Sequence, residues 1–265
     1  MKNDRRNIVP RNMISLALVT LVGAASPDTG GARAEPFSAE EVLAKTRAAY
    51  AALTSYADSG AVNDEMSGFT NHSTFRTLFA RNPRNLLIEF RAVDSEYKAG
   101  NRIPLNSHVV LWMENSELQS WSSRSQSHET YSADGGQQVN ALKLSGYSTA
   151  GISVLIPSHF YTKSGLASPV HAMEEAQADG FETVNGRRCY RILGVERWRY
   201  PSGRETGVRA ITVWVDAETY LIHKVFQDTP KGMPRGEISR RTTTIRYRVN
   251  PRLEPGQFRF TVPES

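Results

Sequence analysis

The feature that most constrains this chain is a two-residue alternation of apolar and polar side chains that returns in segment after segment. Phe75 and Phe79 share one face of an extended segment, and Leu86, Ile88 and Phe90 share one face of the next. About ten such segments, separated by Gly-, Pro- and Asn-containing turns, are expected to be strands: 56–66, 70–81, 84–93, 107–115, 117–123, 172–184, 187–198, 208–217, 219–228 and 238–249. This succession predicts a mainly β (α+β) fold with a single antiparallel sheet, strongly curved or partly closed.

Two segments depart from this pattern and predict helices. In 38–53, Ser38 followed by Glu41 forms a capping box, and apolar residues then recur at helical spacing on one face. Such an amphipathic helix must lie against an apolar surface. In 136–168, apolar residues occur without clean alternation around Gly and Pro, which indicates two short helices or a lid-like insertion.

The N-terminus has the order of a secretory leader. Four Lys/Arg in the first eleven residues precede an apolar run at 13–25, and Ala32-Arg33-Ala34 is a small-x-small cleavage signal. The run is shorter than the about 20 residues of a membrane span. We therefore expect residues 1–34 to be a cleaved signal peptide and 35–265 to be a single soluble, periplasmic domain. The alternative, a core helix of a cytoplasmic protein, does not explain the charged flank and the cleavage triplet.

The net charge and the cysteine content limit the kinds of binding partner and membrane anchor to be expected. The whole sequence has a net charge of +5, of which five Lys/Arg and two Asp in 1–34 contribute +3, leaving +2 for 35–265. This near balance gives no reason to expect a nucleic-acid partner. Cys189 is the only cysteine, so no cysteine directly follows the leader to carry a lipid anchor. In a strand-like segment it is expected to be buried and inert, with intermolecular pairing as the alternative.

The sequence contains no complete catalytic or metal-binding motif. Residues 146–150, Gly-Tyr-Ser-Thr-Ala, are similar to a nucleophile elbow, but Ala150 stands where the second glycine belongs. The six His never fall at short metal-ligand spacing. We therefore expect no enzyme, no cofactor and no metal site.

Charged pairs elsewhere are expected to be solvated. Asp64-Glu65 lies in a predicted strand or turn, where solvated charge explains it, although carboxylates that converge in three dimensions would be invisible in the sequence. Arg240-Arg241, Arg246 and Arg248 are expected on the outer face of a strand as edge or surface charges.

Three stretches of this sequence resemble a known family: the helix-to-strand start Tyr50–Gly60, the hairpin Ile211–Lys224 with its Asp turn, and the tail Val249–Phe260. They are similar to the LolA/LolB-like periplasmic lipoprotein carriers, and nearest to the predicted periplasmic proteins of unknown function in that superfamily. The resemblance implies an incomplete β-barrel over 35–265, its concave side covered by the N-terminal helix and a short helical lid. In the carriers, that apolar concavity accepts lipoprotein acyl chains. Without a lipid-anchor cysteine, this chain resembles the soluble carrier, and no functional residue matches by position.

The expected function is that of a soluble periplasmic carrier or binding protein for a hydrophobic or amphipathic ligand. The expected partners are lipid or lipoprotein acyl chains and a membrane-bound protein that donates or accepts them. The alternative is a non-catalytic sensor or interaction module of the same fold that binds a lipoprotein or a membrane protein. The candidate lining is apolar: Phe75, Phe79, Leu86, Ile88, Phe90, Val110, Trp112, Val154, Leu155, Ile156, Phe160, Val213 and Val215. The competing interpretation is that these residues form a filled core.

Overall fold

The computed structural model describes residues 37–263 apart from gaps at 115, 133–134, 161–167, 169, 200–204 and 229–237. The expected leader, 1–34, and its cleavage site lie outside the described residues. Within the described part of the chain, no helix has the length and apolar character needed to cross a membrane.

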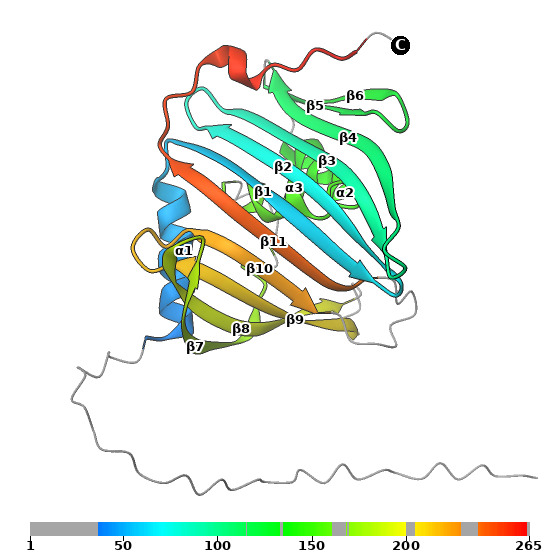
Figure 1. Ribbon diagram of the computed structural model, residues 1–265. Helices are drawn as coiled ribbons and strands as arrows, with labels where there is room; N and C mark the ends of the chain where they lie inside the picture. The colour runs from blue at the N-terminus through cyan, green and yellow to red at the C-terminus, as the bar shows by residue number, and fades with distance from the viewer. Residues whose placement is uncertain are drawn as a thin grey trace, which may run out of the picture. The chain divides into compact units, whose positions relative to one another are not determined.

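The described strands form one antiparallel sheet of eleven strands, seen in Figure 1. Its strand order is β6-β5-β4-β3-β2-β1-β11-β10-β9-β8-β7. The first and last strands, β1 and β11, pair in the middle, whereas β6 and β7 lie at opposite edges, so the sheet is curved but not closed. The predicted single curved antiparallel sheet is confirmed. The strands are β1 Ser55–Met66, β2 Phe69–Ala80, β3 Asn85–Tyr97, β4 Arg102–Glu114, β5 Glu117–Ser122, β6 Ser127–Tyr131, β7 Glu174–Val184, β8 Arg187–Arg199, β9 Glu205–Asp216, β10 Ile222–Asp228 and β11 Ile238–Val249.

Two parts of the sheet were not predicted. Strand β6 is missing from the expected set because Ser127–Tyr131 is mostly polar and exposed, with no apolar face to reveal it. Strands β3 and β4 extend beyond the expected ends, to Tyr97 and from Arg102, because their distal parts carry polar residues and a register shift near Ala92. The longer β3–β4 hairpin matters below because it carries apolar side chains into solvent.

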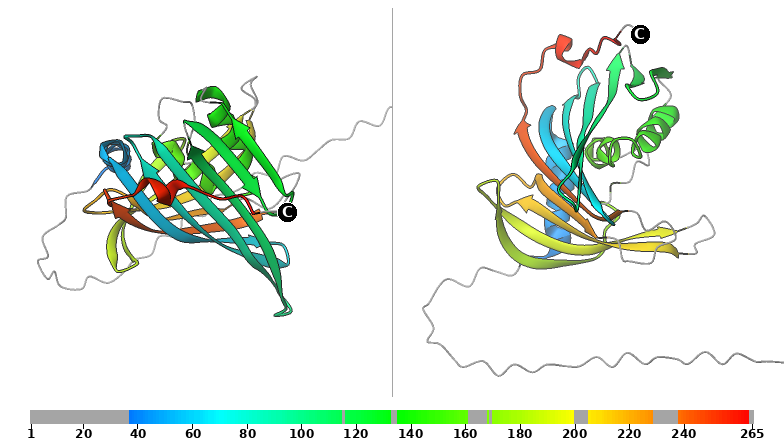
Figure 2. Two further views of the ribbon diagram at one scale, coloured as in Figure 1. Left: turned by 90° about the horizontal axis from the view of Figure 1, so that it is seen from above. Right: turned by 45° about the vertical axis from the view of Figure 1, so that its right-hand side comes forward.

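Helices cover one face of the sheet, which we call the inner face. They are α1 Ala39–Ala52, α2 Gly135–Ser145, α3 Ile152–Leu155 and the 3-10 helix η1 Pro157–His159. We call residues 135–160 the lid; Figure 2 shows the sheet curving around it. Half of the expected capping box forms at α1: the amide of Glu41 donates to Ser38 Oγ at 3.4 Å, while the Glu41 carboxylate pairs with Lys45.

The opposite face of the sheet, the outer face, is crossed at one end by the C-terminal segment 251–263, which includes the 3-10 helix η2 Pro255–Phe258 (Figure 1). Phe258 is buried there against Leu78 and Leu87, in an apolar cluster separate from that of the inner face. Alternating residues of the same strands therefore pack into two separate apolar clusters, one on each face of the sheet.

Candidate functional site

The centre of the inner face is filled by the lid. The ring of Phe160 stacks on Phe79 with centroids 4.1 Å apart, and Ile152 and Ile156 are fully buried against the sheet. Hydroxyl groups hold the lid together internally: Thr149 Oγ1 donates to the carbonyl of Ser145, and Ser153 Oγ to that of Leu142, each at 2.7 Å. The lid is thus a preassembled apolar plug that contacts the sheet through hydrocarbon.

Eleven of the thirteen candidate lining residues lie in or against this inner cluster. The sheet and the lid bring together Phe75, Phe79, Leu86, Ile88, Phe90, Leu155, Ile156, Phe160, Val213 and Val215, all buried, with Val154 half-buried beside them. In the conformation described, these side chains contact each other, and only Val154 and Leu155 among them border a hollow on the inner face.

Val110 and Trp112 lie on the other face. Both belong to the outer cluster beneath the C-terminal segment, whereas Val109 and Leu111 point into the inner cluster. Because β4 is apolar at five consecutive positions, 109–113, its alternation could not assign the faces, and a shift of one residue moves every side chain to the opposite side.

A first hollow, which we call the rim hollow, remains open beside the lid on the inner face. It has a volume of about 670 Å³ and lies between strands β2–β5 and the lid loop. Its lining mixes apolar and small polar side chains with one arginine: Phe69, Asn71, Ala92, Ser95, Tyr97, Leu105, Asn106, Ser107, Val109, Ser122, Arg124, Tyr147 and Ser148. Three of its apolar residues are well exposed, namely Tyr147 at 94 %, Tyr97 at 40 % and Leu105 at 38 %. Ile103, 52 % exposed, follows on the same hairpin.

A second hollow, the charged hollow, lies on the other side of the same loop. Its volume is about 300 Å³, and Tyr147 borders both hollows. The lid contributes Val154 and Leu155, whereas the sheet contributes Glu196, Arg209, Gln227 and Arg241. One wall of this hollow is therefore apolar and the opposite wall is polar.

The charges of that wall are paired across strands. Arg241 Nη2 donates to Asp64 Oδ2 at 3.1 Å, and Arg209 Nε donates to Glu196 Oε2 at 2.8 Å. This corrects two expectations: Asp64 is buried rather than solvated, and Arg241 lies on the inner face of β11, which is a central strand and not an edge. The alternating strand places Arg241 inward and Arg240 outward, which the dipeptide alone does not reveal.

A polar group is buried on the inner face near the start of β1. The carboxyl of Asp58 is 6 % exposed and lies by register opposite Thr77 and Tyr247. It forms no ion pair within the described residues. Burial raises its pKa to about 7, because the charged form loses its hydration.

A histidine of the lid shares this environment. His159 stacks on Tyr50 of α1 at 4.2 Å, and neither ring nitrogen has a hydrogen-bond partner among the described residues. Burial holds the pKa of His159 well below its usual range, so the lid presents a neutral ring to Tyr50 of α1.

The Asp216 turn between β9 and β10 is structural. Asp216 Oδ1 accepts from the amides of Glu218 and Thr219, while Oδ2 accepts from Arg187 Nε at 2.9 Å and lies 3.1 Å from His223 Nε2. Burial alone would raise the pKa of Asp216, but these partners hold it below its usual range. The carboxylate thus fixes a turn and the start of β10.

No chemistry suited to metal binding is assembled in the part of the chain that the structure describes, where no three His, Cys, Asp or Glu side chains converge. Ser148, in the segment similar to a nucleophile elbow, donates its hydroxyl to the carbonyl of Ser145 at 3.1 Å within the lid loop. Cys189 is fully buried, and burial raises its pKa to about 11.

Sequence reasoning missed the residues that surround the rim hollow. Tyr97 and Leu105 lie beyond the predicted strand ends, and Tyr147 was considered only as a neighbour of Ser148. The available signal was large apolar side chains in a turn-rich, polar context at the hairpin tip, which a folded chain ordinarily avoids exposing.

Comparison with known proteins gives likenesses of fold only. A scan against protein-family models and a search of curated protein sequences found no match. Among solved structures, the lipoprotein LppX of Mycobacterium tuberculosis is similar, with 14 % identity, 81 % of this chain and 98 % of that chain covered, and a TM-score of 0.43. LprF of Mycobacterium bovis is similar with 11 % identity, coverage of 85 % and 96 %, and a TM-score of 0.44.

A LolA superfamily protein from Nitrosomonas europaea, the superfamily that the sequence resembles, is similar with 10 % identity, coverage of 84 % and 98 %, and a TM-score of 0.33. These scores are too low for any property of those proteins to be transferred to this chain.

Proposed function

We propose that this protein is an exported, non-catalytic carrier or binding protein for an amphipathic ligand with a hydrocarbon chain. The observation that carries the proposal is the rim hollow of about 670 Å³, which opens beside an apolar lid and is bordered by exposed Tyr97, Leu105 and Tyr147. Exposed apolar groups around a concave opening are unfavourable in water and are typical of a binding site for a hydrophobic ligand.

The lid supplies the remaining space when it moves. Its residues Ile152, Ile156 and Phe160 occupy the position on the inner face where a hydrocarbon chain would lie. A chain that replaces them gains about 0.8 kcal/mol for each methylene it buries, so ten methylenes provide about 8 kcal/mol against the lost lid contacts. Phe75, Phe79, Leu86, Ile88, Phe90, Val213 and Val215 would then line the occupied groove.

The charged hollow suits the other end of such a ligand. Its polar wall, with Arg241 paired to Asp64 and Arg209 paired to Glu196, borders the same hollow as the apolar Val154 and Leu155 of the lid. A polar headgroup placed there would stay hydrogen-bonded while its chain is buried.

We propose that residues 1–34 direct export and are cleaved near Ala34, so that 35–265 works in the periplasm, where hydrophobic ligands must be shielded from water between membranes. A membrane-bound donor or acceptor protein is then the expected partner.

The test is recovery of the protein from the periplasm with its own leader, followed by mass spectrometry of bound lipid and titration with a fluorescent acyl probe. Saturable probe binding is expected. Ser107→Trp, which fills the rim hollow, should weaken binding, whereas Thr74→Trp on the outer face of β2 should not. Recovery without lipid and without probe uptake would contradict the carrier proposal, and a stoichiometric protein partner would favour a sensor instead.

A further inference from the structure

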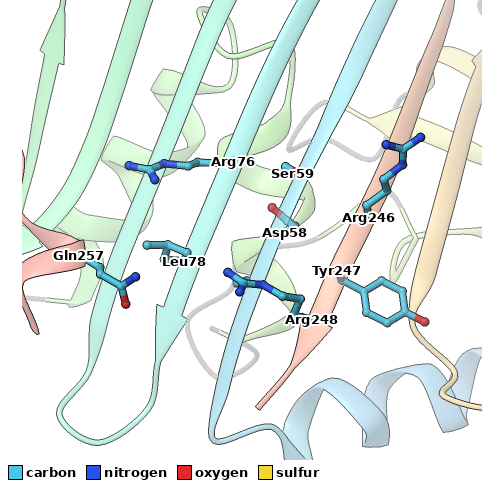
Figure 3. A pocket seen from close by; sticks show the side chains of 9 residues that line it. Asp58, Ser59, Arg76, Leu78, Arg246, Tyr247, Arg248 and Gln257 are labelled. Carbon is cyan, nitrogen blue, oxygen red and sulfur yellow. The ribbon is translucent and has the colours of Figure 1, made fainter. Parts of the chain in front are cut away.

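A third hollow lies on the outer face, opposite the inner-face site. Its volume is about 320 Å³ (Figure 3). On its outer face, strand β1 contributes the small side chains of Ala57 and Ser59, which leave a depression between the neighbouring strands. The neighbouring strands place larger residues beside them, and the trough follows from this difference in size.

The register puts arginines on both sides of the trough. Ser59 lies opposite Arg76 of β2 and Arg246 of β11, and Ala57 lies opposite Arg248. Figure 3 shows Arg248 reaching across β1 toward Gln257, which closes one end from η2. The hollow is thus bordered by three arginines and one amide, while Asp58 and Tyr247, from the same two central strands, complete its lining.

Most of this positive charge is not neutralised. Arg76 Nε pairs with Glu89 Oε2 at 2.8 Å. Arg246 and Arg248 are exposed, and neither forms an ion pair with a residue in the described ranges. Arg91, exposed on the adjacent strand, adds further positive charge to this face. The two unpaired cations, Arg246 and Arg248, repel each other, and an anion between them removes that repulsion.

The floor of the trough separates it from the inner face. Ala57 and Leu78 are buried below the arginines as part of the outer cluster, and no lid residue borders this hollow. Arginine forks match phosphate oxygens in geometry and are less strongly hydrated than lysine. A tetrahedral phosphate offers oxygens in several directions, as arginines approaching from two strands require, whereas a planar carboxylate does not.

We propose that this outer-face hollow is a binding site for a phosphate group, held by Arg76, Arg246 and Arg248. The phosphate comes either from a soluble phosphate compound or from the headgroup of an anionic phospholipid. The site is independent of the inner-face function, because the outer-face hollow shares no lining residue with the rim hollow or the charged hollow.

The experiment titrates the full protein with inorganic phosphate by calorimetry at low ionic strength, and separately measures flotation with phosphatidylglycerol and with phosphatidylcholine vesicles. The test variant is Arg246→Gln with Arg248→Gln. The matched control, Arg47→Gln with Arg188→Gln, removes two exposed positive charges from α1 and β8, away from the trough. Circular dichroism checks that both variants fold, which their exposure leads us to expect.

The wild-type protein and the control should bind phosphate saturably, and the test variant should bind about tenfold or more weakly, since each lost charge-assisted contact is strongly felt. Loss of flotation with phosphatidylglycerol in the same variant identifies the headgroup as the source, and unchanged flotation identifies a soluble phosphate compound. Absence of phosphate binding by the wild-type protein, or equal weakening in both double variants, would overturn the proposal.

Discussion

The inner and outer faces of the sheet are made by the same strands and have opposite chemistry. On β3, Leu86, Ile88 and Phe90 point inward and are at most 4 % exposed, while Glu89 and Arg91, each next to Phe90, point outward. The inner face is covered by a helical plug and bordered by exposed apolar groups, and the outer face carries arginines around a trough. A two-residue repeat thus lets one short segment build a surface for hydrocarbon and a surface for anions.

The largest expected effect comes from truncating a buried aromatic side chain of the lid. Phe160→Ala should lower the free energy of unfolding by about 3–5 kcal/mol, because the ring packed on Phe79 leaves a cavity. The same change should speed uptake of an acyl probe, because the lid competes less well for the inner face. Urea unfolding and stopped-flow fluorescence measure the two effects.

The matched control for that variant lies under the C-terminal segment. Phe258→Ala, on the outer face, also removes a buried ring and should also destabilise the protein, but it should leave probe uptake unchanged. Equal acceleration by both variants would show that general loosening, and not the lid, controls access to the inner face.

The next effect is a pH dependence that belongs to the inner face. Asp58 ionises near its ordinary pKa of 3.8 when unfolded but near 7 when folded, so the folded state holds the proton more tightly. Stability from this group is therefore fully present below pH 3.8 and is lost as pH rises toward and through 7. The wild-type protein should lose about 4 kcal/mol of stability between pH 4 and pH 8 through this group, and Asp58→Asn should abolish that loss.

Urea unfolding at several pH values checks this difference. Glu89→Gln, a change of the same chemical kind on the outer face, should leave the slope of stability against pH as it is in the wild-type protein. A slope that persists in Asp58→Asn would mean that another group is responsible.

Much of this architecture could be predicted from the sequence because it depends on local pattern. The strands, the helix at 38–53 and the interruption at 136–168 follow from periodicity and turn residues. Strand β6 could not be predicted, because its polar residues are held by pairing with β5 rather than by an apolar face. Val110 and Trp112 could not be assigned to a face, because β4 is apolar on both sides.

The hollows depend on contacts between distant segments, which the sequence does not display. Tyr147 borders the rim hollow only because the lid loop returns over β2–β5, and Arg241 becomes internal only because β11 pairs with β1. The outer-face trough likewise requires Arg76 and Arg246, far apart in the chain, to lie on either side of Ser59.

The smallest effect on stability is expected at the rim. Ile103→Ser changes an exposed side chain and should alter the free energy of unfolding by no more than about 0.5 kcal/mol. It should nevertheless slow uptake of the acyl probe, because the apolar approach to the rim hollow is reduced. Val249→Ser, a similarly exposed apolar residue at another strand end, should leave the uptake rate unchanged.

The central claim is that the lid occupies space that a hydrocarbon chain takes over. Spin labels at Lys143→Cys on the lid and Thr74→Cys on the outer face report this directly by pulsed electron–electron double resonance. The labels attach at these two sites because the native Cys189 is fully buried. The account predicts that saturating palmitate lengthens the distance between the labels by several ångströms. An unchanged distance in protein shown to have palmitate bound would contradict it.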